Sequence, residues 1–166
     1  LIIAVIVFAG MSEVSMNNWT SAFLERAVQI PKIIGDTVGV CLFAVMLGTG
    51  RLLYGLFGEK YDIWKLMAGG SLLACVCYLT AALAGFPALA LAGCVFCGLA
   101  VSLLWPGSVV LAGRQFPLAG AWLYAMLAAG GDIGAAIGPY LLGVVTDHAA
   151  GFPLLKELQQ AGGLSS

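Results

Sequence analysis

The sequence predicts an all-α integral membrane protein, and three observations lead to this fold class. Hydrophobic residues make up 61% of the 166 residues and charged residues only 9%, whereas soluble globular domains carry about 25% charged residues. The mean hydropathy is +1.03. The apolar residues fall into five runs, each suited to crossing a hydrocarbon core of about 30 Å as a helix. A chain of this length and apolarity cannot hide its surface in a soluble fold.

The first predicted span is unusual because its centre is polar. The five spans cover about residues 1–24, 37–57, 64–84, 88–112 and 118–146. Glu13 is the only charge in the first span, and Glu13, Asn17 and Thr20 recur at the spacing of one helix face. Because polar side chains are costly in lipid, we expect this face to meet other helices or a water-filled cavity.

The second span follows a polar connection from Glu25 to Asp36. Pro31 in this connection blocks a continuous helix. We expect Asp36 to begin the second helix, because the positive end of the helix dipole favours a negative charge. Arg51 lies about two turns before the end of this span, where it can extend to the membrane interface or pair inside the bundle.

The third and fourth spans come from residues 66–113, which contain no charged residue. This stretch is too long for one span and fits two, and the turn signal Gly85-Phe86-Pro87 divides it. Within the fourth span, Pro106 should free a backbone carbonyl and bend the helix. The bend is either a packing kink or a device that places Trp105 in the wall of a cavity.

The fifth span combines one charge with a regular glycine pattern. Asp132 is its only charged residue, and a carboxylate at membrane depth costs about 2.5 kcal/mol or more on insertion scales. Gly130, Gly134 and Gly138 recur every four residues, which places them on one face where another backbone can approach closely. Such a face suits a helix that moves against its partner.

The two acids at membrane depth, Glu13 and Asp132, are candidates for proton coupling. A carboxylate removed from water favours its neutral form, so either could carry a proton. The alternative for Asp132 is a structural ion pair with Arg51, because buried acids are often simply paired. Glu13 is open to the same two interpretations.

Several function classes find no support in the sequence. The net charge is −1 without a basic patch, so nucleic acid is not an expected partner. We expect no metal site and no cofactor, and the absence of HExxH and GxSxG argues against an enzyme. The single histidine, His148, lies at a predicted loop edge without an expected role. The cysteines are expected to be small, reduced packing residues: Cys41, Cys75, Cys77, Cys94 and Cys97.

Three stretches of the chain suggest a family. The first is the polar-centred Gly10-Met11-Ser12-Glu13-Val14-Ser15-Met16-Asn17-Asn18-Trp19, the second is Gly50-Arg51-Leu52-Leu53-Tyr54-Gly55-Leu56-Phe57-Gly58-Glu59-Lys60, and the third is the glycine-rich run ending in Gly138-Pro139. Together they resemble the second half of a major facilitator superfamily transporter, from its seventh to its eleventh helix. The first is similar to the seventh helix of fucose-permease-like and related sugar carriers.

The second stretch resembles the degenerate second copy of the superfamily's cytoplasmic loop signature. Its signature residues would be Gly50, Arg51, Gly58 and Lys60. Tyr54 stands where the signature has aspartate, which argues against an aspartate-based latch. The superfamily places this loop in the cytoplasm, and the charge bias agrees. Basic residues on that side are Lys60, Lys65 and Arg114, with Arg51 close by, and those on the other side are Arg26, Lys32 and Lys156.

The resemblance implies a five-helix fragment of a twelve-helix bundle in the cell membrane. Six helices would precede Leu1 as an N-terminal half, and residues 147–166 would be a loop before a missing last helix. The two halves of such a protein rock around a midplane cavity. The implied function is secondary active transport of a small polar solute, a sugar or an organic anion, coupled to protons by symport or antiport.

Four residues are expected to contact the solute: Asn17, Asn18, Trp19 and Trp105. The alternative for the two asparagines is hydrogen bonding between helices. The competing function is a non-transporting membrane scaffold or sensor subunit. A cavity lined by Glu13, Asn17 and Trp105 would favour transport, and dry, fully packed polar faces would favour the scaffold.

Overall fold

The computed structural model describes residues 1–26, 31–84 and 86–149, and every element in these ranges is helical. The elements are α1 (Ile2–Arg26), α2 (Lys32–Ile34), the π-helical turn η1 (Gly35–Gly39), α3 (Val40–Phe57), the 3-10 turn η2 (Gly58–Lys60), α4 (Ile63–Leu83), α5 (Pro87–Val101), α6 (Leu104–Gln115) and α7 (Gly120–Ala149). Five helical segments are long and apolar enough to cross a membrane: Ile2–Glu25, Lys32–Phe57, Ile63–Leu83, Pro87–Gln115 and Gly120–His148. The predicted five-span, all-helical organisation is therefore confirmed for the described residues.

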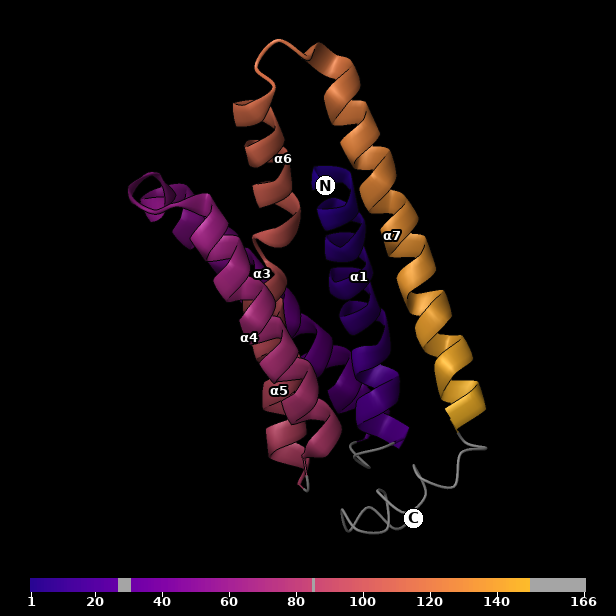
Figure 1. The fold of residues 1–166 in the computed structure, drawn as a ribbon. Helices are drawn as coiled ribbons and strands as arrows, with labels where there is room; N and C mark the ends of the chain where they lie inside the picture. Colours follow the sequence, from indigo (N-terminus) through magenta and orange to yellow (C-terminus); the bar gives the residue numbers. More distant parts are fainter. Residues whose placement is uncertain (27–30, 85, 150–166) are drawn as a thin grey trace.

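The helices form two packed groups that meet at α1. In Figure 1, α1 stands in the middle of the bundle, α7 runs along one side of it, and α4 and α5 lie on the other. α1 packs mainly on α7, while α5 packs against both α3 and α4. α1 also contacts α5 and α6, which joins the two groups. The segment from α5 to α6 is the most buried of the five spans.

The second span begins earlier than the sequence suggested. Its helix starts at Lys32, directly after Pro31, because proline lacks an N–H and is well tolerated before the first turn. The prediction that Asp36 begins this helix is wrong, since Asp36 lies inside η1. There its carboxylate accepts a hydrogen bond from the Ser21 hydroxyl of α1. Asp36 therefore ties two helices together. Residues 27–30 of the predicted connection lie outside the described residues.

The fourth span is broken, as Pro106 predicted. α5 ends at Val101 and α6 begins at Leu104. Pro106 has no N–H to donate to the carbonyl of Ser102, four residues earlier. The helical ladder resumes with Gly107, whose N–H donates to Leu103 at 2.8 Å. The break therefore leaves the Ser102 carbonyl free for another donor.

The fifth span extends further than predicted. α7 begins at Gly120, whose φ of +66° is the left-handed conformation that glycine tolerates best. His148 lies in the last turn of α7 with Nδ1 2.8 Å from the Val144 carbonyl, so the predicted loop edge is wrong. Gly85 of the predicted turn and residues 150–166 of the predicted final loop lie outside the described residues.

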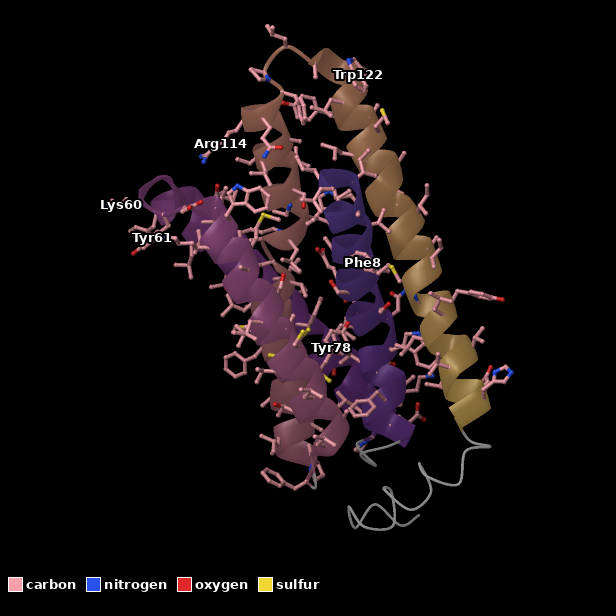
Figure 2. All side chains as sticks on the ribbon, in the orientation of Figure 1. Phe8, Lys60, Tyr61, Tyr78, Arg114 and Trp122 are labelled. Carbon is pink, nitrogen blue, oxygen red and sulfur yellow. The ribbon has the colours of Figure 1, made fainter. Side chains whose placement is uncertain are left out.

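The outward faces of α3 and α4 are apolar, and two basic residues predicted to share one membrane side lie at one end of the bundle. Exposed leucines, including Leu52, Leu56, Leu72 and Leu79, face outward along α3 and α4. Figure 2 shows Lys60 and Arg114 at the same end of the bundle, as alternate connections require.

The cysteines divide between the core and the outer surface. All five are free thiols. Cys77, Cys94 and Cys97 are buried in the core, as expected of small packing residues. Cys41 and Cys75 are exposed, so the expected packing role is wrong for them, because α3 and α4 turn these positions outward.

Candidate functional site

A close contact between α1 and α7 forms the rigid side of the candidate site. A Cβ atom at Gly134 would collide with the carbonyl of Val7, and one at Gly138 would lie 2.8 Å from the Met11 Cα. A Cβ at Gly10 of α1 would collide with the carbonyl of Gly131 on α7. We call this contact of Gly10, Gly131, Gly134 and Gly138 the glycine interface. It brings two backbones together without side chains between them.

Gly130, Gly134 and Gly138 follow one regular spacing in the sequence, but they differ in how much space surrounds them in the structure. A Cβ at Gly130 would lie 3.4 Å from Ile3 Cγ2, which is an ordinary van der Waals contact. Gly134 and Gly138 have no such room. Gly10 and Gly131 were not singled out, because neither continues the four-residue repeat that identified the others.

A charged cluster lies on the other side of α1. Nη2 of Arg51, from α3, lies 2.9 Å from Oε1 and 3.1 Å from Oε2 of Glu13. Nε of Arg51 donates to the Ser102 carbonyl at 3.2 Å. We call Glu13, Arg51 and the Ser102 carbonyl the charged cluster. It joins α1, α3 and the α5–α6 break, and 43% of the Arg51 side chain but only 19% of the Glu13 side chain is exposed.

Glycines explain how Arg51 reaches the helix break. A Cβ at Gly50 would lie 2.7 Å from Ser102 Cβ, and one at Gly98 of α5 would collide with the Phe43 carbonyl of α3. α3 and α5 can therefore approach closely at this level. Arg51, the residue after Gly50, then lies beside the carbonyl that Pro106 leaves unpaired. The position of the cluster follows from glycines on α3 and α5 and from a proline in α6.

The geometry places the residues of the predicted loop signature. Gly50 and Arg51 lie inside α3, and Gly58 and Lys60 lie in the turn η2 that follows it. Of the two alternatives for Arg51, the structure shows pairing inside the bundle, with Glu13 and the Ser102 carbonyl as partners.

The predicted alternative pairing of Asp132 with Arg51 is wrong. Asp132 is exposed. It lies on the side of α7 opposite Gly134, since two residues rotate a helix by about 200°. Gly134 contacts α1, so Asp132 faces away from it. No hydrogen bond or ion pair ties Asp132 to another described residue.

The four expected solute contacts do not converge on one site. Asn17 and Asn18 are exposed on α1. The indole N–H of Trp19 already has a partner within the bundle, because Nε1 donates to the Pro139 carbonyl of α7 at 3.3 Å. The Trp105 ring packs where a Gly131 side chain would lie, with Cζ2 2.7 Å from the position of its Cβ. The two tryptophans therefore join helices, and only the asparagines stay open.

The expected common polar face of α1 is also divided. Thr20 is buried, its hydroxyl donates to the Met16 carbonyl at 2.5 Å, and its methyl group packs near Gly39 of η1. Asn17 is exposed one turn earlier. The division arises because the π-helical turn covers only the end of α1. The helical spacing of Asn17 and Thr20 could not show that a neighbouring element covers only one of them.

The cavities around the bundle are mostly apolar, and none of those described here is lined by Glu13, Asn17 or Trp105. The cavity nearest the charged cluster, of about 380 Å³, lies between α3, α4 and α5 and reaches Gly50 and Ser102. None of these four cavities is the one that was expected to favour transport. The polar face is not fully packed either, since Asn17 and much of Arg51 are exposed.

A second polar link was not predicted. Tyr78 of α4 donates its hydroxyl to the Ser12 carbonyl of α1 at 2.8 Å. Both residues line a cavity of about 390 Å³ between α1 and α4, together with Phe8. Figure 2 shows Phe8 and Tyr78 on the face where α1 is visible between α4 and α7. Tyr78 lies in a long uncharged run, so no sequence signal marked it.

Comparisons of the chain with protein-family models, with curated proteins and with solved structures found no match. The geometry of the described residues and the resemblance of the three stretches are therefore the basis for a functional assignment.

Proposed function

We propose that this chain is the C-terminal-half membrane bundle of a major facilitator superfamily transporter. Its function in the cell membrane would be secondary active transport of a small polar solute, coupled to protons. The resemblance of the three stretches supports the family, and five membrane-compatible helices are compatible with it. The charged cluster supports the coupling to protons.

The observation that carries the proposal is the link from Glu13 through Arg51 to the broken helix. Three spans meet at this one guanidinium. Ionisable groups at membrane depth are costly and generally mark a pathway or a coupling site. Discontinuous helices near the midplane are a recurrent feature of transporter binding sites. The cluster combines both features in a single place.

Protonation of Glu13 would change this link directly. A neutral carboxyl no longer forms an ion pair with Arg51, so the hydrogen bond between them would weaken while the bond from Arg51 to the Ser102 carbonyl would remain. The contact between α1 and α3 would weaken, while the glycine interface between α1 and α7 would be unaffected because it contains no charge. A proton would thereby shift the balance between two arrangements of the bundle.

Other residues have narrower roles in this proposal. Asn17, one helical turn from Glu13, and Asn18 are open to hydrogen-bond a solute. Trp19 and Trp105 are assigned to helix packing. Asp132 remains a second candidate proton carrier, on a face of α7 that no described helix covers.

The experiment uses the full-length gene product reconstituted in proteoliposomes. Uphill uptake driven by a pH gradient is compared with solute counterflow, over a panel of radiolabelled sugars and organic anions. Glu13→Gln should abolish uphill uptake and retain counterflow, because translocation continues without a proton carrier. The matched control is Glu25→Gln, an exposed acid at the end of the same helix, which should change neither.

Two outcomes would contradict the proposal. If Glu13→Gln leaves both uphill uptake and counterflow unchanged, Glu13 is not the coupling residue. If the unmodified protein shows no saturable counterflow with any solute, the scaffold or sensor function is favoured instead.

A further inference from the structure

The Arg51 guanidinium has donors that no described residue uses. A guanidinium carries five N–H donors. Nε donates to Ser102, and Nη2 donates to both oxygens of Glu13. Among the described residues, Nη1 has no acceptor. The Arg51 side chain is 43% exposed, so the described residues do not enclose it.

Arg51 is also the one basic residue in the interior of a described span. Every other basic residue of the described ranges lies within about one turn of a helix end, as expected of residues that extend to the interface. These residues are Arg26, Lys32, Lys60, Lys65 and Arg114. A cation at the depth of Arg51 therefore has a role that membrane anchoring does not explain.

From this geometry we infer that the transported solute is a small organic anion and that Arg51 recognises its carboxylate. The inference rests on the proposed transport function and deepens it by naming the solute class. A planar guanidinium edge matches the two oxygens of a carboxylate, and such charge-assisted pairs are about twice as strong as neutral hydrogen bonds. A neutral sugar hydroxyl would gain much less from the same group.

Charge balance explains why a proton would accompany the anion. Glu13 and Arg51 together are neutral. A bound monocarboxylate adds one negative charge, and one proton on Glu13 restores neutrality. The same proton weakens the bond between Glu13 and Nη2 of Arg51, so an anionic carboxylate could displace it and bind both Nη1 and Nη2. Anion binding and protonation of Glu13 therefore favour each other, and this coupling is reciprocal.

The surroundings of Glu13 contain no other described charge that would replace this balance. Arg51 is the charged group from α3. α5 and α6 contribute the Ser102 carbonyl, and α4 contributes the neutral Tyr78 hydroxyl, which bonds to the residue before Glu13. Asp132 on α7 lies on the side away from α1.

The test compares solutes that differ only in charge, in proteoliposomes of the full-length gene product. The pairs are glucuronate with glucose, galacturonate with galactose, and lactate with propane-1,2-diol. Counterflow is expected for anionic members and not for their neutral partners. Arg51→Lys should reduce anion counterflow about tenfold or more, because lysine cannot form the two-pronged contact. The matched control Arg114→Lys, at the end of α6, should leave it unchanged.

A second variant tests anion binding independently, in case Arg51→Lys loses counterflow only because it folds poorly. Glu13→Gln keeps the guanidinium and removes its competitor. Glucuronate, galacturonate or lactate, whichever shows counterflow, should therefore raise the melting temperature of this variant in detergent at least as much as that of the unmodified protein.

The outcomes separate this inference from the proposed function. Counterflow of the neutral members at equal rates would overturn the anion assignment and leave transport intact. Retention of anion counterflow in Arg51→Lys, or loss of anion binding in a folded Glu13→Gln protein, would also overturn it. No counterflow for any member of either set would overturn the proposed function and this inference together.

Discussion

α1 makes two contacts of opposite physical character. Towards α7 it uses the glycine interface, in which Gly134 and Gly138 bring backbone against backbone without a charged group. Towards α3 it uses the charged cluster, in which Glu13 and Arg51 meet at a helix break and remain partly exposed. The first contact depends on shape alone. The second depends on whether Glu13 carries its charge.

This difference indicates which parts of the bundle can move. Gly134 lies so close to the Val7 carbonyl that even one added carbon would collide with it. Backbone atoms cannot rotate aside as side chains do, so α1 and α7 have little room to slide along each other. We therefore expect α1 and α7 to move as one unit, against the group formed by α3, α4 and α5. The sequence had suggested that the glycine-rich helix moves against its partner.

Gly134→Ala should destabilise the bundle most. The added methyl group would collide with the Val7 backbone, and overpacking of this kind costs about 3 kcal/mol at its upper end. The measurement is reversible unfolding in mixed micelles by titration with a denaturing detergent. Gly130→Ala is the matched control on the same helix, because its methyl group would meet only ordinary contacts. If both variants lose the same free energy of unfolding, the close backbone contact at Gly134 does not exclude a side chain there.

Arg51→Met should destabilise the protein by about 2 kcal/mol. Removing one partner of a fully buried ion pair costs about 3–5 kcal/mol, and the exposure of Arg51 lowers this figure. Adding Glu13→Gln to the variant should recover much of the loss, because no unpaired carboxylate remains. A double-mutant cycle by the same unfolding titration measures the coupling between the two residues. A coupling energy near zero would mean that the ion pair does not hold α1 to α3.

Pro106→Ala should change stability by less than about 1 kcal/mol. The N–H that this substitution introduces would bond to the Ser102 carbonyl and displace Arg51 from it, so one hydrogen bond replaces another. Counterflow should nevertheless fall, because the α5–α6 break would close and Arg51 would lose its second partner. Full counterflow in a stable Pro106→Ala protein would show that the break is only a packing kink.

Trp19→Phe should have the smallest effect. It removes one hydrogen bond to the Pro139 carbonyl, and interhelical bonds of this type contribute about 0.6 kcal/mol on average. Counterflow should be unchanged, because Trp19 joins α1 to α7 and does not contact the solute. Trp122→Phe, at an exposed position of α7, serves as the control for loss of a tryptophan. A selective loss of counterflow in Trp19→Phe would restore this residue to the solute site.

Features that depend only on residues close together in the sequence could be predicted from it. The five spans follow from runs of apolar residues, since length and apolarity suffice to identify them. The break in the fourth span follows from Pro106, because a missing N–H affects only its own helix. Asp36 shows the limit of this reasoning. Its charge fits a helix start, but Pro31 already provided one, and the carboxylate bonds to Ser21 of another helix instead.

The candidate site was only partly predictable. Glu13 was identified because an acid in an apolar run is conspicuous in one dimension. Its partner was not, since Arg51 lies 38 positions away in sequence and Asp132 was an equally available acid. Which of these two acids pairs with Arg51 depends on which helix packs beside α3. Trp19 and Trp105 were expected at the solute, and the structure shows both in contact with another helix. An aromatic ring suits a solute and a packed helix equally well, so the sequence could not distinguish these environments.

The sequence by itself determined that the chain forms five membrane-compatible helices, that one is broken, and that three charges lie at membrane depth. These properties are set by local composition and by the chemistry of single residues. The tertiary structure alone decided that Arg51 joins Glu13 to the Ser102 carbonyl, that Asp132 faces away from α1, and that Gly10 and Gly131 complete the glycine interface. These contacts join residues from different helices, and the rotation and neighbours of each helix are fixed only when the whole bundle packs.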